Sequence, residues 1–165
     1  MKRVALYPGS FDPFTVGHLD IVQRLSPLYD EVVVAVLSNP KKTPYLPEEA
    51  RVRSIEESVK CLPNVRVLCS AGATVDVARQ AGARTMIRGL RSVTDFEYET
   101  TLAAGYHYMA PEIETLFLLA KPEHGYISSS LVREIHALGG DVSALVPAPV
   151  LSALAQKNPR KENEK

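Results

Sequence analysis

The chain has 165 residues, of which 45% are hydrophobic and 23% charged, so it is long enough for one globular domain with a core and short for two. Nineteen basic and nineteen acidic residues cancel, which excludes a global positive field that would recruit nucleic acid or an anionic membrane. No apolar run approaches the roughly 20 residues that span a bilayer, and the first ten residues lack the features of a signal peptide. We therefore expect a cytoplasmic protein that binds neither nucleic acid nor membrane.

The two cysteines, Cys61 and Cys69, are isolated in the sequence. Neither belongs to a C-x-x-C motif or has a histidine at metal-binding spacing, which argues against a thiolate zinc site. We expect both thiols to be reduced.

Five short β-branched or apolar runs predict strands. Several are apolar nearly throughout, as strands buried on both faces of a parallel sheet are. The predicted strands cover residues 3–8, 31–37, 64–70, 83–89 and 114–120.

Amphipathic stretches between these runs predict helices, bounded by proline, glycine and serine signals. The first begins near Gly17 and ends near Pro27, and a last one follows Pro147 or Pro149. The others begin at Pro47 and cover about 74–82, 94–110 and 128–140.

The regular alternation of strand and helix predicts an α/β fold, a doubly wound, five-stranded parallel sheet with helices on both faces. We expect a single domain over residues 1–158 and a disordered tail at 159–165. Because the crossovers are right-handed, all carboxyl ends of the strands meet at one edge, where ligands bind in such folds.

The loops that follow the predicted strands collect basic side chains at this edge, although the chain as a whole is neutral. The residues are Lys41, Lys42, Arg88, Arg91 and Lys121. Two helix starts, at Gly17-His18 and Ser129-Ser130, add backbone N–H groups that suit phosphate. The pattern therefore predicts a phosphate-bearing ligand, and a nucleotide is our first hypothesis.

Common nucleotide and nucleophile motifs are missing from the sequence. There is no G-x-x-x-x-G-K-[ST] loop, no G-x-G-x-x-G after the first strand and no G-x-S-x-G elbow. The chemistry is then expected to rely on positioning and electrostatics, as phosphoryl and nucleotidyl transfer can.

Two motifs carry a family resemblance. "TVGH" (15–18) resembles the T/H-x-G-H motif of the nucleotidyltransferase superfamily, and "ISSSLVRE" (127–134) resembles its I-S-S-S/T-x-x-R signature. Together with "YPGSFDPF" (7–14), "RGLR" (88–91) and "DFEYE" (95–99), they make the chain similar to the bacterial phosphopantetheine adenylyltransferases from about residue 3 to residue 157.

This resemblance implies a Rossmann-like nucleotidyltransferase fold and the following reaction. The adenylyl group of MgATP passes reversibly to 4′-phosphopantetheine by direct in-line attack, without a covalent enzyme intermediate. The products are dephospho-coenzyme A and pyrophosphate, in coenzyme A biosynthesis. The resemblance further implies a homohexamer, Mg²⁺ carried mainly by ATP rather than by a metal site of the chain, and coenzyme A as a candidate inhibitor.

The resemblance also implies site residues. His18 is the implied catalytic residue, which contacts the α-phosphate and stabilises the transition state. The implied ATP-binding residues are Ser10, Phe11, His18, Gly89, Leu90, Arg91, Glu99, His124, Gly125, Tyr126, Ile127, Ser128, Ser129 and Ser130. The implied substrate-binding residues are Ser10, Lys42, Thr74 and Arg88. Two of these depart from the common pattern, since many members have threonine at Ser10 and an apolar residue at Thr74.

Several alternatives stay open at this point. The chain could be a nicotinamide-mononucleotide adenylyltransferase, a glycerol-phosphate cytidylyltransferase, or a non-catalytic nucleotide sensor that kept the pocket. Arg88 and Arg91 could be surface ion-pair partners of the "DFEYE" acids, and Glu99 could lie on an exposed helix face. The aromatic and methionine side chains of 98–109 are expected in the core or at a subunit interface.

Overall fold

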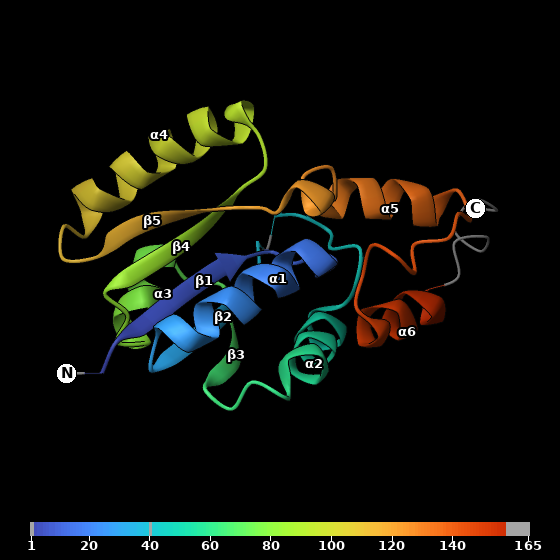
Figure 1. Ribbon diagram of the computed structural model, residues 1–165, viewed down its shortest axis with the longest axis horizontal. Helices are drawn as coiled ribbons and strands as arrows, with labels where there is room; N and C mark the ends of the chain where they lie inside the picture. Colours follow the sequence, from blue (N-terminus) through green and yellow to red (C-terminus); the bar gives the residue numbers. More distant parts are fainter. Residues whose placement is uncertain (1, 40, 158–165) are drawn as a thin grey trace.

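The computed structural model describes residues 2–39 and 41–157 (Figure 1). Its five strands form one parallel sheet with the order β3-β2-β1-β4-β5. They are β1 (Val4–Gly9), β2 (Glu31–Leu37), β3 (Val65–Ser70), β4 (Thr85–Leu90) and β5 (Glu114–Leu119). The doubly wound fold predicted from the sequence is confirmed; the expected tail lies outside the described residues.

The helices follow the predicted positions closely. The chain forms α1 (Val16–Leu25), α2 (Glu48–Val59), α3 (Thr74–Gln80), α4 (Val93–Met109), α5 (Ser129–Ala137) and α6 (Ala148–Gln156), with 3₁₀ turns η1 (Ser26–Leu28) and η2 (Pro122–His124). Pro27 lies in η1, just beyond the end of α1. Gly82 follows α3 with φ of 70°, a left-handed conformation that glycine adopts without strain.

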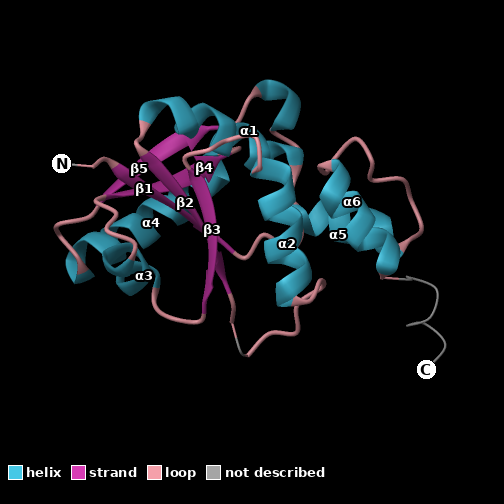
Figure 2. Ribbon diagram, turned by 90° about the horizontal axis from the view of Figure 1, so that it is seen from below, coloured by secondary structure: helices cyan, strands magenta, loops and turns pink. Residues whose placement is uncertain are grey.

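The sheet separates two apolar cores, because successive side chains of a strand point to opposite faces. Ala5 and Tyr7 of β1 face a core shared with α1, α2, α5 and α6, whereas Val4 and Leu6 face a smaller core shared with α3. α2 and α3 accordingly lie on opposite sides of the sheet (Figure 2). The near-complete burial of β1 and β2 explains their unbroken apolar sequences.

Strands β1 and β4, at the centre of the sheet, separate toward their carboxyl ends. β1 pairs with β2 over six residues but with β4 only at Ala5–Thr85 and Leu6–Met86. The chain order also reverses between β1 and β4, so this opening lies at the topological switch point where ligands bind in such sheets.

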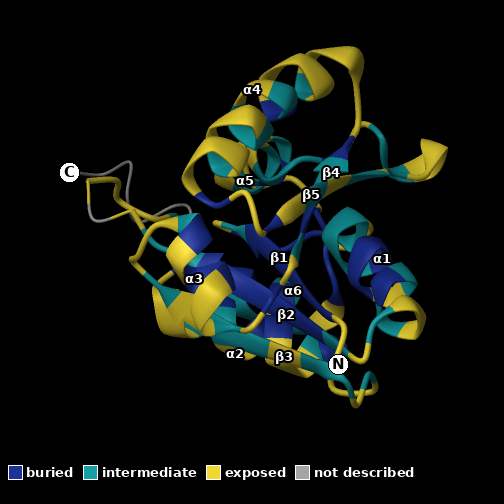
Figure 3. Ribbon diagram, turned by 90° about the vertical axis from the view of Figure 1, so that its left-hand side faces the viewer, coloured by how far each residue is buried: buried dark blue, intermediate teal, exposed yellow. Residues whose placement is uncertain are grey.

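α4 packs loosely against the rest of the chain. Among its 17 residues only Glu99 is buried. The helix stands out beside β4 and β5, with most of its surface exposed (Figure 3).

Two further predictions can be compared with the structure. Cys61 and Cys69 are exposed free cysteines. Within residues 2–39 and 41–157, no helix combines the length and the apolar character needed to cross a membrane.

Candidate active site

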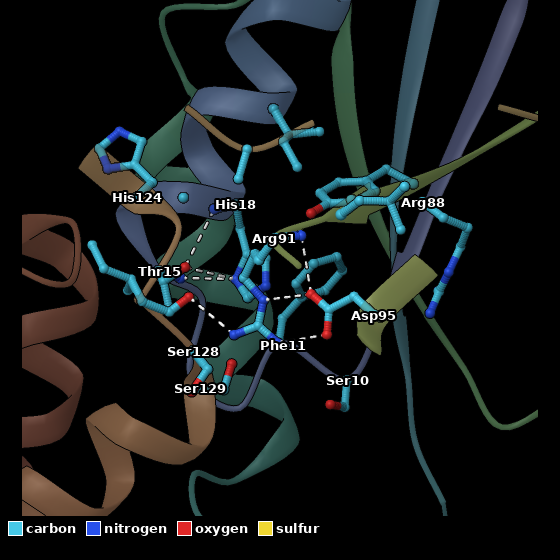
Figure 4. A pocket seen from close by; sticks show the side chains of 18 of the residues that line it. Ser10, Phe11, Thr15, His18, Arg88, Arg91, Asp95, His124, Ser128 and Ser129 are labelled. Carbon is cyan, nitrogen blue, oxygen red and sulfur yellow. Dashed lines mark hydrogen bonds and ion pairs between the residues drawn. The ribbon is translucent and has the colours of Figure 1, made fainter. Parts of the chain in front are cut away.

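A cavity of about 360 Å³ opens at the switch point between β1 and β4; we call it the first cavity. The ends of β1 and β4, the starts of α1 and α5, and the inner face of α4 form its walls (Figure 4). Its lining residues are Tyr7, Pro8, Gly9, Ser10, Phe11, Thr15, Gly17, His18, Ile21, Arg88, Gly89, Leu90, Arg91, Asp95, Glu99, Ala120, His124, Ile127, Ser128, Ser129, Ser130 and Arg133.

The loop after β1 forms the floor beneath His18. Phe11 has a φ of 46°, a left-handed conformation that is rare outside glycine, and its side chain is only 3% exposed. Its ring lies under Gly9, where an added Cβ would stand 2.9 Å from the ring, so glycine is required there. The same ring meets the His18 imidazole edge-on at 5.1 Å between centroids. A packed aromatic floor therefore fixes the plane of the imidazole.

Thr15 fixes the orientation and tautomer of His18. The backbone N–H of Thr15 donates to His18 Nδ1 at 3.0 Å, and the backbone N–H of His18 donates to Thr15 Oγ1 at 3.3 Å. This reciprocal capping box begins α1, with histidine in the place that glutamate or glutamine usually takes. Because Nδ1 accepts a hydrogen bond, it carries no proton, and the neutral imidazole has its N–H at Nε2.

Burial, followed by the positive charges of Arg91 and Arg88, lowers the pKa of His18 to about 4. The side chain is thus neutral at physiological pH. His18 can donate one hydrogen bond through Nε2 without adding a positive charge to the cavity.

Arg88 and Arg91 are each held by an acid of α4. Arg88 donates from Nε and Nη2 to the two carboxylate oxygens of Glu99 at 2.6 and 2.7 Å, and from Nη1 to the carbonyl of Pro8 at 3.0 Å. Arg91 donates from its backbone N and from Nε to Asp95 Oδ2 at 3.0 and 3.1 Å. The ion pairs that the sequence left open as an alternative are therefore present, and both lie in the wall of the first cavity. Glu99 is buried rather than exposed.

The start of α5 closes the far side of the cavity. Ser128 caps the helix, with its hydroxyl accepting from the backbone N–H of Leu131 at 3.1 Å, and Ser129 donates from Oγ to the carbonyl of Pro13 at 2.8 Å. Arg133 donates to Ser130 Oγ at 3.1 Å and to the carbonyl of Asp12 at 2.6 Å. Serine hydroxyls and the positive end of a helix dipole thereby face the same space as His18, an arrangement suited to phosphate.

A larger cavity of about 870 Å³, the second cavity, adjoins the first. Ser10 and Arg133 line both cavities, so these two residues mark where the cavities adjoin. The second cavity is lined by Ser10, Asp12, Leu37, Ser38, Asn39, Lys42, Thr43, Pro44, Tyr45, Glu48, Arg51, Ala71, Arg133 and Lys157.

Most of the site residues expected from the sequence meet in the first cavity. These are Ser10, Phe11, His18, Arg88, Gly89, Leu90, Arg91, Glu99, His124, Ile127, Ser128, Ser129 and Ser130. Lys42 lies in the second cavity, whereas Thr74, Gly125 and Tyr126 line neither. Lys121, counted with the cations of this edge, forms an ion pair with Asp20 of α1 at 2.5 Å.

Several lining residues were not foreseen from the sequence. Thr15 and Arg133 belong to the two quoted motifs but were given no role, and Asp95 begins "DFEYE". Asp12 belongs to the quoted stretch "YPGSFDPF" but was likewise given no role. Arg51 bonds to the Ser10 carbonyl, 41 residues earlier in the chain, a contact that no sequence pattern marks.

No group of three or more metal-ligating side chains occurs within the described part of the chain. The two carboxylates of the first cavity, those of Asp95 and Glu99, are both engaged with arginines. The described residues therefore offer no carboxylate cage to a divalent cation in this cavity.

Comparison with known proteins agrees with this fold. A family model described as cytidylyltransferase-like matches residues 6–135. A crystal structure from Vibrio parahaemolyticus, named for a nicotinate-nucleotide adenylyltransferase, covers 98% of this chain and 97% of that chain with a TM-score of 0.73; at 18% identity it shows the shared fold alone. The chain thus belongs to the cytidylyltransferase-like class of nucleotidyltransferases.

Curated relatives narrow the class to one family. The chain is 50% identical to a phosphopantetheine adenylyltransferase of Synechococcus sp. (strain JA-2-3B'a(2-13)), over 94% of this chain and 98% of that protein. It is 45% identical to the Lachnoclostridium phytofermentans protein of the same name, over 98% and 99%, and 50% identical to that of Lacticaseibacillus casei, over 94% of each. The chain belongs to the phosphopantetheine adenylyltransferase family.

Proposed function

We propose that this chain transfers the adenylyl group of MgATP to 4′-phosphopantetheine, forming dephospho-coenzyme A and pyrophosphate. The observation that carries the proposal is the junction of two cavities at Ser10 and Arg133, with a neutral histidine, arginines and a helix start facing the smaller one. Two phosphate-bearing substrates can meet at such a junction. The names of the relatives indicate which two.

ATP occupies the first cavity in this proposal. Arg91, the end of β4 and the start of α5 surround its phosphates, and Glu99 lies beside them. The first turn of α5 places N–H groups and serine hydroxyls where the departing pyrophosphate gathers negative charge. Mg²⁺ enters with ATP as part of that substrate and neutralises phosphate charge there.

The acceptor occupies the second cavity, with its phosphate at the junction. Ser10 lines both cavities, Arg88 of β4 lines the first cavity, and Lys42 supplies a cation in the second. The larger volume of the second cavity suits the long pantetheine arm. Thr74 is the least supported member of this set, because it lines neither cavity.

The chemistry is a direct in-line attack. The acceptor phosphate is already a nucleophile, so the principal barrier is the approach of two anions, which is costly where water is excluded. Cationic side chains offset this repulsion, and no covalent intermediate with the enzyme forms. His18 donates through Nε2 to the α-phosphate as charge develops on it, and loss of such a donor costs about 10²–10³ in rate.

We further propose that the chain works as a homohexamer in the cytoplasm. Several apolar side chains of α4 and β5 are exposed, with exposures from 46% to 91%: Val93, Phe96, Tyr98, Tyr108, Met109, Leu116 and Leu119. A second copy of the chain is an occupant that would cover such a surface. Leu119→Glu should lower the native mass; an unchanged mass would contradict this interface. Coenzyme A, which shares the acceptor's pantetheine arm, is proposed as an inhibitor that competes with it.

The test of the reaction is the release of pyrophosphate with three acceptors. MgATP is the nucleotide for 4′-phosphopantetheine and for nicotinamide mononucleotide, and CTP replaces it for glycerol 3-phosphate. Release with 4′-phosphopantetheine alone is expected. Release with another acceptor alone would replace the proposal, and ATP binding without release would indicate a nucleotide sensor.

His18→Ala tests the catalytic assignment. We expect turnover to fall by about 10²–10³ while ATP affinity stays within a few-fold, since the contact strengthens in the transition state. His107→Ala is the matched control, because His107 lies exposed on α4 and lines neither cavity. A large loss of ATP affinity with intact turnover would refute a transition-state role.

A further inference from the structure

Two charged side chains in the wall of the second cavity are buried and bonded to backbone groups. Arg51 of α2 is only 4% exposed, and it donates from Nη1 to the carbonyl of Ser10 at 2.8 Å and from Nε to the carbonyl of Leu46 at 3.2 Å. Asp12 is 9% exposed, and its carboxylate accepts the backbone N–H groups of Tyr45 at 2.6 Å and Leu46 at 2.8 Å. Burying a charged side chain costs free energy, so the burial of Asp12 and Arg51 calls for a structural or functional explanation.

The four hydrogen bonds join two loops that are distant in sequence. Ser10 and Asp12 lie in the loop after β1. Tyr45 and Leu46 lie in the loop after β2, three and four residues beyond Lys42. Arg51 contacts both loops from outside, and Asp12 reaches from one into the other. Two side chains therefore tie the loop that carries Ser10 to Tyr45 and Leu46, a few residues beyond Lys42.

The conformation of the first loop needs this support. Phe11, with its left-handed φ of 46°, lies directly between Ser10 and Asp12. A non-glycine residue holds such a conformation only where the surroundings over-determine it. Arg51 fixes the carbonyl before Phe11, Asp12 fixes the side after it, and Arg133 adds a bond to the carbonyl of Asp12.

We propose that Asp12 and Arg51 are positioning residues for the acceptor, which hold Ser10 and Lys42 at the separation that its phosphate requires. This inference rests on the proposed function. Neither side chain needs to touch a substrate: each acts on backbone groups of the two loops that carry the contacting residues. The bonds are charge-assisted, and so are stronger than bonds between neutral groups.

Arg51→Lys tests the role of the guanidinium. Lysine keeps the charge and much of the stem but replaces the planar fork by a single mobile ammonium group, which cannot hold both carbonyls in one geometry. We expect the KM for 4′-phosphopantetheine to rise about tenfold, because a displaced Ser10 would lose its hydrogen bond to the charged acceptor phosphate. ATP affinity should fall less than acceptor affinity, because Arg91 and the start of α5 lie outside the four-bond set, although Ser10 and Phe11 line the first cavity as well. Arg53→Lys is the matched control on the exposed side of the same helix.

Asp12→Asn tests the other half. One amide oxygen can accept only part of what two carboxylate oxygens accept, and its NH₂ group opposes the remaining N–H donor. The same rise in acceptor KM is expected. In the double variant the two effects should not add, because both changes loosen the same pair of loops.

The test measures initial rates of pyrophosphate release. The proteins compared are wild type, the two single variants, the double variant and the Arg53→Lys control. Calorimetry gives the ATP affinity of each, and thermal unfolding shows that each is folded at the assay temperature. A selective, non-additive rise in acceptor KM supports the positioning role. An unchanged acceptor KM, additive effects, or an equal loss of kcat with both KM values unchanged would overturn it. An inactive wild-type protein would instead refute the proposed function itself.

Discussion

The depressed pKa of His18 predicts a pH-dependent part of the stability. Burial is the main cause, and the charges of Arg91 and Arg88 act in the same direction, lowering the pKa from 6.5 to about 4. At 1.36 kcal/mol per unit, this difference corresponds to about 3 kcal/mol. Between these two pH values the unfolded chain binds more protons at this residue than the folded one. The contribution is therefore complete above about pH 6.5 and is lost as the pH falls toward 4.

His18→Asn removes this contribution. Urea unfolding of wild type and variant at a series of pH values from 7.5 to 4 gives the difference between their free energies of unfolding. That difference should change by about 3 kcal/mol in favour of the variant as the pH falls. His107→Asn, at an exposed position on α4, corrects for the loss of a histidine as such.

A nuclear magnetic resonance titration of the imidazole nitrogens gives an independent measurement. Below its pKa His18 gains a proton at Nδ1, so the hydrogen bond from the Thr15 N–H must break. Titration of His18 near its ordinary pKa, or a stability difference that stays flat with pH, would refute the neutral Nε2–H donor on which the proposed mechanism depends.

Three further substitutions test single contacts of the site. Thr15→Val removes the cap of α1, so urea unfolding should show a loss of about 1 kcal/mol that Thr15→Ser restores; equal stability of the serine and valine variants would contradict the capping role. Gly89→Ala places a methyl group 2.6 Å from Cδ1 of Ile21, the end of a flexible side chain, and we expect the free energy of unfolding to fall by about 1 kcal/mol, a loss that a second change, Ile21→Val, relieves. No relief in the double variant would show that the close approach is not the cause. Glu99→Gln leaves the part-buried guanidinium of Arg88 without its carboxylate, so the free energy of unfolding measured in urea should fall by about 3 kcal/mol. An unchanged free energy of unfolding would mean that the fold does not need the ion pair.

The fold could be predicted from the sequence because its determinants are local. The run "EVVVAVL" is apolar after Glu31 and contains four valines, and it forms β2 over Glu31–Leu37, buried on both faces. Pro27 and Gly82 marked helix ends for steric reasons that act within a few residues.

The burial of the aromatic residues of α4 could not be predicted in the same way. Tyr98, Tyr108 and Met109 are exposed in the chain, so their assignment to its own core is wrong, and the interface assignment stays a proposal. Tyr106 alone of this group packs against the smaller core. Apolar residues occur on all sides of this helix, so its sequence has no periodicity that would indicate which face packs inward.

The site was foreseen as a set of loops but not as a set of contacts. The sequence placed Ser10, His18, Arg88 and Ser128 at one edge of the sheet, and they do line one cavity. It did not indicate that Lys42 faces a second cavity, because the path of the loop after β2 depends on bonds from Asp12, 33 or 34 residues earlier. Long-range contacts of this kind leave no periodic signal.

The electrostatics of the site also differ from what counting cations suggests. Three arginines line the first cavity, but the carboxylates of Asp95 and Glu99 oppose them, which leaves a formal charge of only +1. Because both carboxylates are bonded to arginine N–H groups, an incoming phosphate must compete with them or share the guanidinium. The acids therefore limit phosphate affinity while they fix the geometry of the cations. For an enzyme that must release pyrophosphate after each turnover, moderate binding in a rigid frame serves catalysis better than a strong and unopposed positive charge.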